Sequence, residues 1–240
     1  MLKRFVMLLC LLALLQAFAV AQKLGPTHRT WELDLFLGSS SLGERTFSTQ
    51  VVATATQTSR QTGLRYAVGT EWGARFLENL GQHWGGAVEY SFTNQPLTFK
   101  NLSDQIPSLH LGHSVHRFAY DVLYFPMSCS KRLRPYVYAG PGVTLFAIHK
   151  DSRSFAQTLG IKLSDPWKVT FNWGGGVKYL LKDHLAANLQ VSDAVSGIPR
   201  YGLPRSALVL GGLTAPGFSP RGRMNNWRIG AGVVFQWDEW

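Results

Sequence analysis

The sequence predicts an all-β chain, an eight-stranded antiparallel up-and-down transmembrane β-barrel, and three observations support this class. Eight segments alternate apolar and polar residues with a period of two, as expected for strands whose two faces meet different solvents. Aromatic residues gather near the ends of these segments, where a membrane meets water. The connections alternate strictly between long ones, about 19 residues or more, and short ones, about 10 residues or fewer.

The strand-like segments follow one another along the whole chain. Most are about 9 to 13 residues long, which is close to the length of a tilted strand that crosses a bilayer. If the mature N-terminus lies in the periplasm, every long connection falls on the outer side, as in known membrane barrels. The segments are 31–37, 64–76, 84–92, 115–125, 136–147, 167–181, 185–191 and 227–237.

The first residues have the pattern of a secretory signal peptide. The basic pair Lys3-Arg4 precedes an apolar stretch from Phe5 to Leu15, and Ala19-Val20-Ala21 is a small-x-small cleavage site. The apolar stretch, at about 11 residues, is shorter than the roughly 20 that a membrane-spanning helix needs. We therefore expect residues 1–21 to be a signal peptide and residues 22–240 to form a single domain.

The composition suits an exported membrane protein. The whole sequence carries a formal net charge of +10. Removal of the leader leaves about +8, which favours contact with anionic lipid headgroups or polysaccharide phosphates, although a generally basic proteome would give the same value. Cys129 is then the only cysteine left, so no internal disulfide is expected. Mean hydropathy near zero is compatible with a barrel, whose alternating faces average out.

The second segment, 64–76, illustrates the two faces. The alternation places Tyr66 and Trp72 on the apolar side and Arg65 and Glu71 on the polar side. Since no helix and no second layer is available to cover the apolar side, lipid is its expected solvent. Within hydrocarbon the sheet must close, because an open edge leaves backbone groups unpaired at a cost of several kcal/mol each.

The fifth segment contains a proline. Pro141 cannot donate a hydrogen bond to a neighbouring strand, and a closed barrel has no free edge to accommodate it. We therefore expect a β-bulge there, which can change the face on which Tyr136 and Tyr138 lie.

The last segment ends in a pattern similar to the signal by which outer-membrane barrels are recognised during assembly. That pattern consists of Gly232, Phe235 and Trp237. With the strand pattern, it makes the sequence resemble the small outer-membrane β-barrel family of OmpA-like transmembrane domains and OmpX-type proteins, over residues 30–237. The resemblance implies a place in the outer membrane of a Gram-negative cell envelope and recognition by the barrel-assembly machinery. In the family the signal closes the chain, whereas here residues 238–240 follow it, too few for a peptidoglycan-binding domain, so we expect no tether to the cell wall.

The inward faces of the strands carry charges of both signs. An eight-stranded barrel is just wide enough for side chains to fill it, and buried ions require partners. We therefore predict a paired polar network in the lumen, with a gated polar pore as the alternative. The predicted charged members are Glu32, Asp34, Arg65, Glu71, Arg75, Glu89, Arg117, Asp121, Lys168, Lys178 and Arg228.

Two short patterns invite chemical interpretations. His110, His113 and His116 are spaced by three, and on a strand this spacing sends successive imidazoles to opposite faces, which argues against a metal site. The pair His113-Ser114 resembles the His and Ser of outer-membrane lipid A deacylases, but adjacent strand residues point apart and no orienting acid is evident. We expect no enzyme activity, no cofactor and no metal.

The seventh connection is basic and rich in proline. We predict that it contacts anions such as lipopolysaccharide phosphates, or a host or phage ligand, and the alternative is a solvated loop above an anionic leaflet. The basic residues are Arg200, Arg205, Arg221 and Arg223.

Three functions remain open from the sequence. The first is a monomeric barrel with a packed interior that acts structurally or through its outer loops, in contact with outer-membrane lipid and lipopolysaccharide and without a nucleic-acid partner. The second is a narrow channel for small solutes or ions, and the third is a lipid-modifying enzyme.

Overall fold

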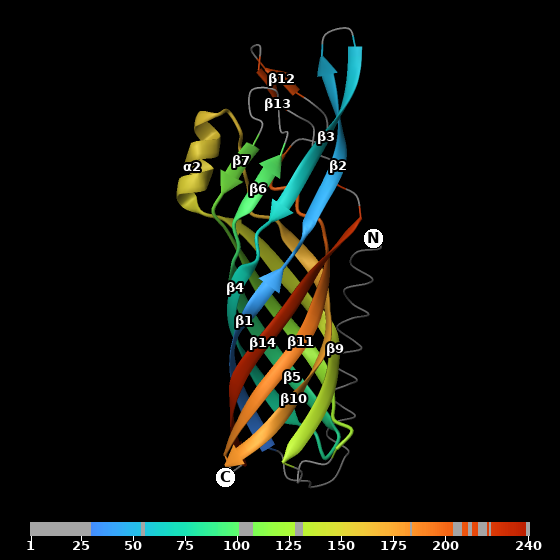
Figure 1. Ribbon diagram of the computed structural model, residues 1–240, viewed down its shortest axis with the longest axis vertical. Coiled ribbons are helices and arrows are strands. Elements are labelled where there is room, and N and C mark those ends of the chain that lie inside the picture. Colours follow the sequence, from blue (N-terminus) through green and yellow to red (C-terminus); the bar gives the residue numbers. More distant parts are fainter. Residues whose placement is uncertain are drawn as a thin grey trace, which may run out of the picture.

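Eight strands of the computed structural model form a closed antiparallel barrel (Figure 1), which confirms the predicted fold class. The structure describes residues 30–53, 56–100, 108–127, 132–182, 184–203, 208–210, 213–215, 220 and 222–238. The barrel strands are β1 (Thr30–Ser41), β4 (Gly69–Asn79), β5 (Trp84–Asn94), β8 (His113–Tyr124), β9 (Leu133–Ile148), β10 (Trp167–Lys182), β11 (Leu185–Gly197) and β14 (Arg223–Asp238). Around the barrel their order is β1-β14-β11-β10-β9-β8-β5-β4, so neighbours along the chain are neighbours in space.

The remaining elements all lie in the long connections, at one end of the barrel (Figure 1). We call this the loop end, and the opposite end, where the short connections lie, the turn end. Four strands form a separate sheet in the order β2-β3-β6-β7, two form a hairpin, and one helix stands beside them. They are β2 (Glu44–Ala53), β3 (Thr56–Tyr66), β6 (Leu97–Lys100), β7 (Ser108–Leu111), α2 (Lys150–Thr158), β12 (Leu208–Leu210) and β13 (Leu213–Ala215). In the part of the chain that the structure describes, no helix has the length and apolar character needed to cross a bilayer.

The second predicted segment divides into two strands, which corrects the expectation of one strand over 64–76. β3 ends at Tyr66 and pairs with β6, and β4 begins at Gly69. At the break, the Gln95 side-chain amide donates to the carbonyl oxygen of Ala67 at 2.7 Å. Leu64 and Tyr66 face an apolar cluster above the barrel instead of lipid, so the alternation continues in phase but serves a different core.

The bulge expected at Pro141 is absent, and that prediction was wrong. The pairs Ala119↔Gly142 and Val122↔Ala139 keep one register on both sides of the proline, although the ladder between β8 and β9 is interrupted between them. Pro141 is exposed on the outer wall, and Tyr136 and Tyr138 are buried in the interior. The barrel register shifts instead between β10 and β11, near the turn end, at Leu180/Lys182.

Glycines on the inward faces make room for the large interior side chains. A Cβ atom added at Gly176 would lie 2.6 Å from the hydroxyl oxygen of Tyr136, and one at Gly140 would lie 2.8 Å from the carboxylate of Asp121. Pairing of glycine with aromatic or charged residues across neighbouring strands therefore lets a narrow barrel hold long polar side chains.

The outer wall is apolar and carries aromatic residues toward both ends. At the turn end Trp31 stacks on Phe76, with ring centroids 5.0 Å apart, and Trp84 contacts Tyr124 at 4.9 Å. Between the ends, large apolar side chains are exposed over a wider area than a soluble monomer tolerates, as expected for a wall that faces lipid. These include Leu35, Leu37, Val88, Phe118, Val122, Val143, Val169, Phe171, Leu189, Val191, Ile229 and Val233.

Candidate functional site: the barrel interior and its cap

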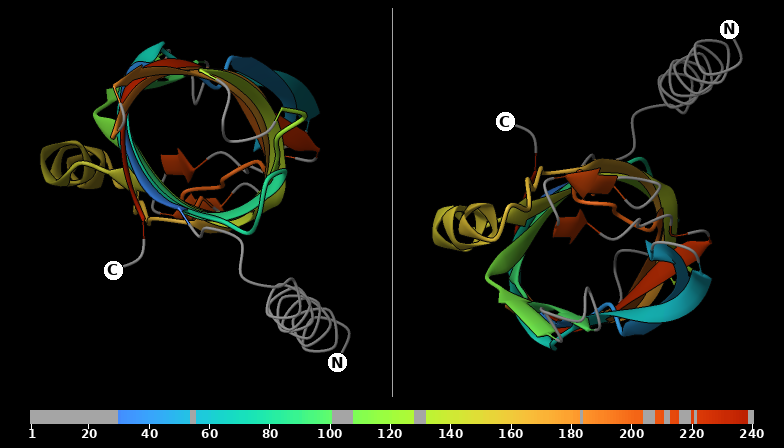
Figure 2. Two further views of the ribbon diagram at one scale, coloured as in Figure 1. Left: turned by 90° about the horizontal axis from the view of Figure 1, so that it is seen from below. Right: turned by 90° about the horizontal axis from the view of Figure 1, so that it is seen from above.

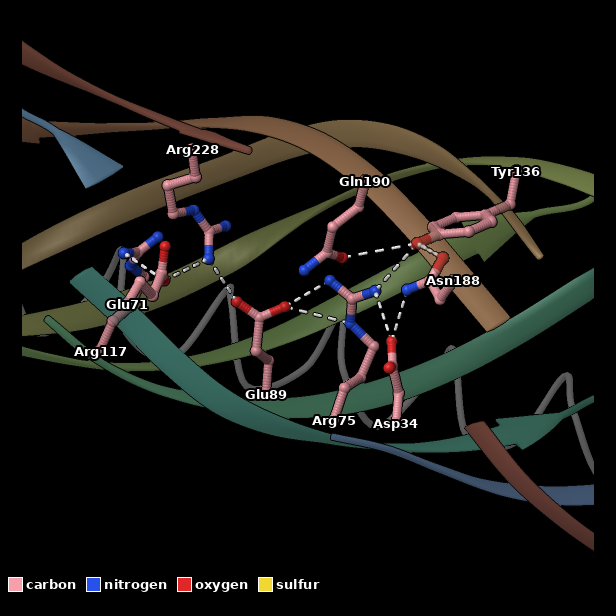
Figure 3. Close-up of polar contacts among 9 residues, drawn as sticks. All are labelled: Asp34, Glu71, Arg75, Glu89, Arg117, Tyr136, Asn188, Gln190 and Arg228. Atoms are coloured by element: carbon pink, nitrogen blue, oxygen red, sulfur yellow. Dashed lines mark hydrogen bonds and ion pairs between the residues drawn. The ribbon is translucent and has the colours of Figure 1, made fainter. Parts of the chain in front are cut away.

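Glu89 is the centre of an ion network in the middle of the barrel (Figure 3). Its carboxylate accepts hydrogen bonds from Arg75, through Nε at 3.1 Å and through an Nη atom, and from Arg228 at 2.7 Å. Arg228 also donates to Glu71 at 3.2 Å, and Glu71 lies 3.5 Å from Arg117. Two carboxylates therefore hold three guanidinium groups, and the five residues come from four different strands.

Arg75 links this centre to a second group of side chains nearer the turn end (Figure 3). Its guanidinium lies 3.9 Å from Asp34 and donates to the Tyr136 hydroxyl at 3.4 Å. Asn188 joins the two partners, because its amide donates to Asp34 at 2.6 Å and its carbonyl oxygen accepts from Tyr136 at 3.0 Å. The guanidinium also lies over the ring of Tyr138, 4.6 Å from its centroid.

Glu32 organises a third group, which closes the turn end. It forms an ion pair with Lys178, lies 3.4 Å from Arg134, and accepts from the Asn79 amide at 2.8 Å. The Arg134 guanidinium covers the ring of Phe125 at 3.5 Å from its centroid. Charged and aromatic side chains together therefore fill the barrel cross-section at this level.

The charges of the interior balance. Five acidic and five basic side chains are buried there among the described residues, each no more than 5% exposed. Burial of an ion is costly unless an opposite charge is close, so a balanced set is the arrangement expected of a filled interior. The acids are Glu32, Asp34, Glu71, Glu89 and Asp121, and the bases are Arg75, Arg117, Arg134, Lys178 and Arg228.

The loop end is closed by an apolar cap around Tyr201. Val115 and Phe146 point inward from the barrel strands and join residues of the loop sheet and of the segment after β11 in one buried cluster. Tyr201 packs edge-on against Phe146, and its hydroxyl contacts His113 at 3.0 Å and Tyr66 at 2.8 Å. Viewed along the barrel axis, the segment after β11 passes across the inside of the ring (Figure 2).

The two tyrosines of the cap stay neutral over a wide range of pH. Burial raises the pKa of the Tyr66 hydroxyl and that of the Tyr201 hydroxyl above their ordinary values. Tyr201 holds its place although its backbone has a φ of 53°, a conformation that residues other than glycine rarely adopt. Strain of this kind persists only where the surroundings fix it, so the cap is a specified structure.

Comparisons with known proteins identify the fold. No family model and no curated protein matches the sequence. Among solved structures, the outer membrane protein OprG of Pseudomonas aeruginosa superposes with a TM-score of 0.55 at 17% identity, covering 88% of this chain and 98% of that one. The chain has the fold of small outer-membrane β-barrels. The barrel domain of OprF from the same organism, at 16% identity over 88% and 100% of the two chains, and Neisserial surface protein A, at 9% over 86% and 96%, each give a TM-score of 0.47.

Most of the predicted lumen residues lie inside the barrel, but three do not join the network. Asp121 is buried in the interior, yet neither of its carboxylate oxygens has a hydrogen-bond partner among the described residues. Arg65 lies on β3, outside the barrel, and is exposed. Its neighbours Leu64 and Tyr66, on the apolar side of β3, are buried in the cap cluster, so Arg65 lies on the opposite side. Lys168 lies partly buried at the loop end of β10. Arg134 is absent from the predicted lumen residues because the predicted fifth segment starts at Tyr136. Strand β9 starts at Leu133, and Arg134 continues the inward alternation of Tyr136 and Tyr138.

The histidines of the barrel point to three different environments. His113 is buried in the cap, where its Nδ1 lies 3.1 Å from the carbonyl oxygen of Gln95. His116 lies on the outer side, 3.0 Å from the Tyr90 hydroxyl, and His110 is exposed on the loop sheet. No group of three metal-ligating side chains occurs within the described ranges.

The other predicted sites are only partly described. Arg200 is half-buried after β11 and Arg223 is exposed at the start of β14, whereas Arg205 and Arg221 lie outside the described residues. The proposed leader and Cys129 lie outside them as well. In the predicted assembly signal, Phe235 and Trp237 are exposed on the outer wall near the turn end, and Gly232 faces Asp34 in the interior.

Proposed function

We propose that this outer-membrane barrel is sealed and acts structurally, with its loop end as the surface that meets other molecules. The balance of charge in the interior carries this proposal. A wide aqueous pore needs an interior that water and ions can replace, whereas here each of the carboxylates of Glu32, Glu71 and Glu89 already holds two cationic groups. The apolar cap and the Glu32 group close the two ends.

Conductance through planar bilayers tests the seal. The protein is first refolded, and compact migration of an unboiled sample in a gel shows that it has folded. It should then give no current above that of the bare membrane. An ion that entered would have to separate buried ion pairs. Removal of one partner from such a pair costs about 3 to 5 kcal/mol. Stable current steps that scale with protein insertion would refute the sealed barrel.

The surface role rests on the basic seventh connection. We expect replacement of Arg200, Arg205, Arg221 and Arg223 by glutamine to weaken binding to lipopolysaccharide and to lessen its dependence on salt, because phosphate contacts by guanidinium are screened by ions. Titration of fluorescent lipopolysaccharide at several ionic strengths measures this. Arg132→Gln, at an exposed residue before β9 near the turn end, is the control, and equal binding by the quadruple variant would exclude the loop contact.

A narrow channel is the second candidate, and one observation favours it. In the barrel interior, several buried polar atoms have no hydrogen-bond partner among the described residues, including both carboxylate oxygens of Asp121, both amide atoms of Asn172 and the Ser192 hydroxyl. Such a region favours internal water. A path to the outside would still require displacement of the cap, so a channel would conduct more after the cap is loosened.

We infer further that the barrel is not an enzyme, that the barrel-assembly machinery recognises Gly232, Phe235 and Trp237, and that the barrel is a monomer. Ser114 and His113 offer no triad, since the His113 ring is engaged by Gln95 and Tyr201. Mass spectra of lipid A with and without the protein test the first point, and altered acylation would contradict it.

A further inference from the structure

Asp193 is an acidic residue on the outer wall of the barrel. It lies on β11 between Trp173 of β10 and Trp227 of β14, as their direct partner in both strand registers. Cross-strand partners share a face of the sheet, and the neighbours Ser192 and Ala194 are buried on the inner face. The carboxylate therefore projects from the side of the barrel that meets lipid, near the loop end of β11.

Two tryptophan rings enclose this carboxylate. The rings of Trp173 and Trp227 meet edge to face with centroids 5.8 Å apart, and they are 44% and 51% exposed on their outer sides. Asp193, between them, is 0% exposed. An aliphatic side chain would be the ordinary choice on this wall, as at Val191 on the same face, which is 50% exposed.

The carboxylate is only half satisfied. Its Oδ2 accepts from the Asn225 amide at 2.6 Å, and Asn225 lies two residues from Trp227 on the same face of β14. Its Oδ1 is buried and has no hydrogen-bond partner among the described residues, and no ion pair to Asp193 occurs among them. A carboxylate can accept hydrogen bonds at both oxygens, so Oδ1 is left to accept from a further donor that the described residues do not supply.

We propose that Asp193, Trp173, Trp227 and Asn225 form a binding site for the ammonium of a lipid headgroup of the phosphoethanolamine type. A carboxylate supplies a charge-assisted hydrogen bond to an ammonium, and indole faces attract the same cation when it lies within about 6 Å of a ring centroid. Because the rings cover Asp193, binding requires them to turn aside, and the ammonium would then reach Oδ1 between them.

The position of the site argues for a lipid over a soluble amine. The two tryptophans belong to the outer wall, beside the apolar residues that face the bilayer. Arg223 is exposed at the start of β14, two residues from Asn225 toward the loop end. Its side chain is long enough to reach the phosphate of a headgroup whose ammonium lies at Asp193. Ammonium and phosphate would then each meet an opposite charge.

Native mass spectrometry of the refolded full-length barrel with defined lipids tests this site. We expect phosphatidylethanolamine to be retained at least about tenfold more strongly than phosphatidylglycerol of the same acyl chains, since only the former has an ammonium. Asp193→Asn keeps the size of the side chain and should abolish this preference. Trp173→Leu should reduce the preference. Trp72→Leu, which replaces an exposed tryptophan on the outer wall at β4, should leave it unchanged.

The controls separate the alternatives. Compact migration of each unboiled variant in a gel shows that the barrel has folded. Asp165→Asn serves as a matched acidic control, because Asp165 is paired with Arg153 outside the barrel wall. Equal retention of the two lipids by the wild-type protein would overturn the proposal, as would an unchanged preference in Asp193→Asn. Competition by free ethanolamine as strong as that by the lipid would overturn the assignment to a lipid headgroup.

Discussion

Replacement of Glu89 by leucine is expected to destabilise the barrel by about 3 to 5 kcal/mol, the usual cost of leaving buried ions without their partner. Glu89 holds both Arg75 and Arg228, and all three side chains are no more than 4% exposed. The variant leaves both guanidinium groups buried with one carboxylate fewer. Urea unfolding in lipid vesicles, followed by tryptophan fluorescence, measures the loss.

Two further variants make this result specific. Glu89→Leu combined with Arg75→Met removes one unpaired cation together with the anion and should recover part of the stability. Val88→Leu changes an exposed side chain on the outer face of the same strand and should change the free energy of unfolding little. If Glu89→Leu unfolds at the same urea concentration as the wild-type protein, the interior network does not stabilise the barrel.

Replacement of Tyr201 by alanine is expected to lower the free energy of opening of the cap by about 3 to 5 kcal/mol, as for other large aromatic residues truncated in a core. The change removes the hydroxyl contacts to His113 and Tyr66 and the packing against Phe99 and Phe146. Faster amide hydrogen exchange over residues 198–203 would report the loss. The barrel itself should still migrate as a compact species.

The conservative variant Tyr201→Phe separates packing from hydrogen bonding. It keeps the ring and loses the two hydroxyl contacts, so its effect should be about 1 to 2 kcal/mol. If the sealed barrel is the correct account, Tyr201→Ala conducts no better than the wild-type protein so long as the ion network is intact. Exchange as slow in Tyr201→Ala as in the wild-type protein would show that Tyr201 does not hold the cap.

The barrel could be predicted from the sequence because a strand between lipid and a polar interior must alternate with a period of two. Six of the eight strands contain their predicted segments in full, as β10 (Trp167–Lys182) contains 167–181. The alternation along β10 also placed Lys178 on the inner face. Strand pairing then followed from the lengths of the connections, since up-and-down neighbours need only short turns at one end.

The loop sheet could not be predicted because its strands alternate in the same phase as the wall. Leu64 and Tyr66 continue the pattern of Trp72 and Phe76, and only tertiary structure decides whether an apolar side chain meets lipid or a cap. Pro141 misled for a related reason. The ladder between β8 and β9 is interrupted locally at the proline, and the register on both sides is kept without a bulge.

Asp193 escaped notice for a different reason. The predicted seventh segment ends at Val191, before Asp193, whereas β11 continues to Gly197. Asp193 is a charged residue on the outer face of this strand, so the exception to the apolar pattern coincides with the residue to which we assign a ligand. Its two covering tryptophans come from strands more than fifty residues apart in sequence, so no local signal joins them.

Thiol labelling of the interior tests the central claim most directly. In a Cys129→Ser background, Ser192→Cys places a thiol on the inner wall, where the native side chain is 2% exposed, and Ser154→Cys places one on the exposed side of α2. A sealed barrel predicts that a membrane-impermeant maleimide labels Ser154→Cys within minutes and leaves Ser192→Cys unlabelled until the protein is denatured. Labelling of folded Ser192→Cys at the rate of Ser154→Cys would contradict the account.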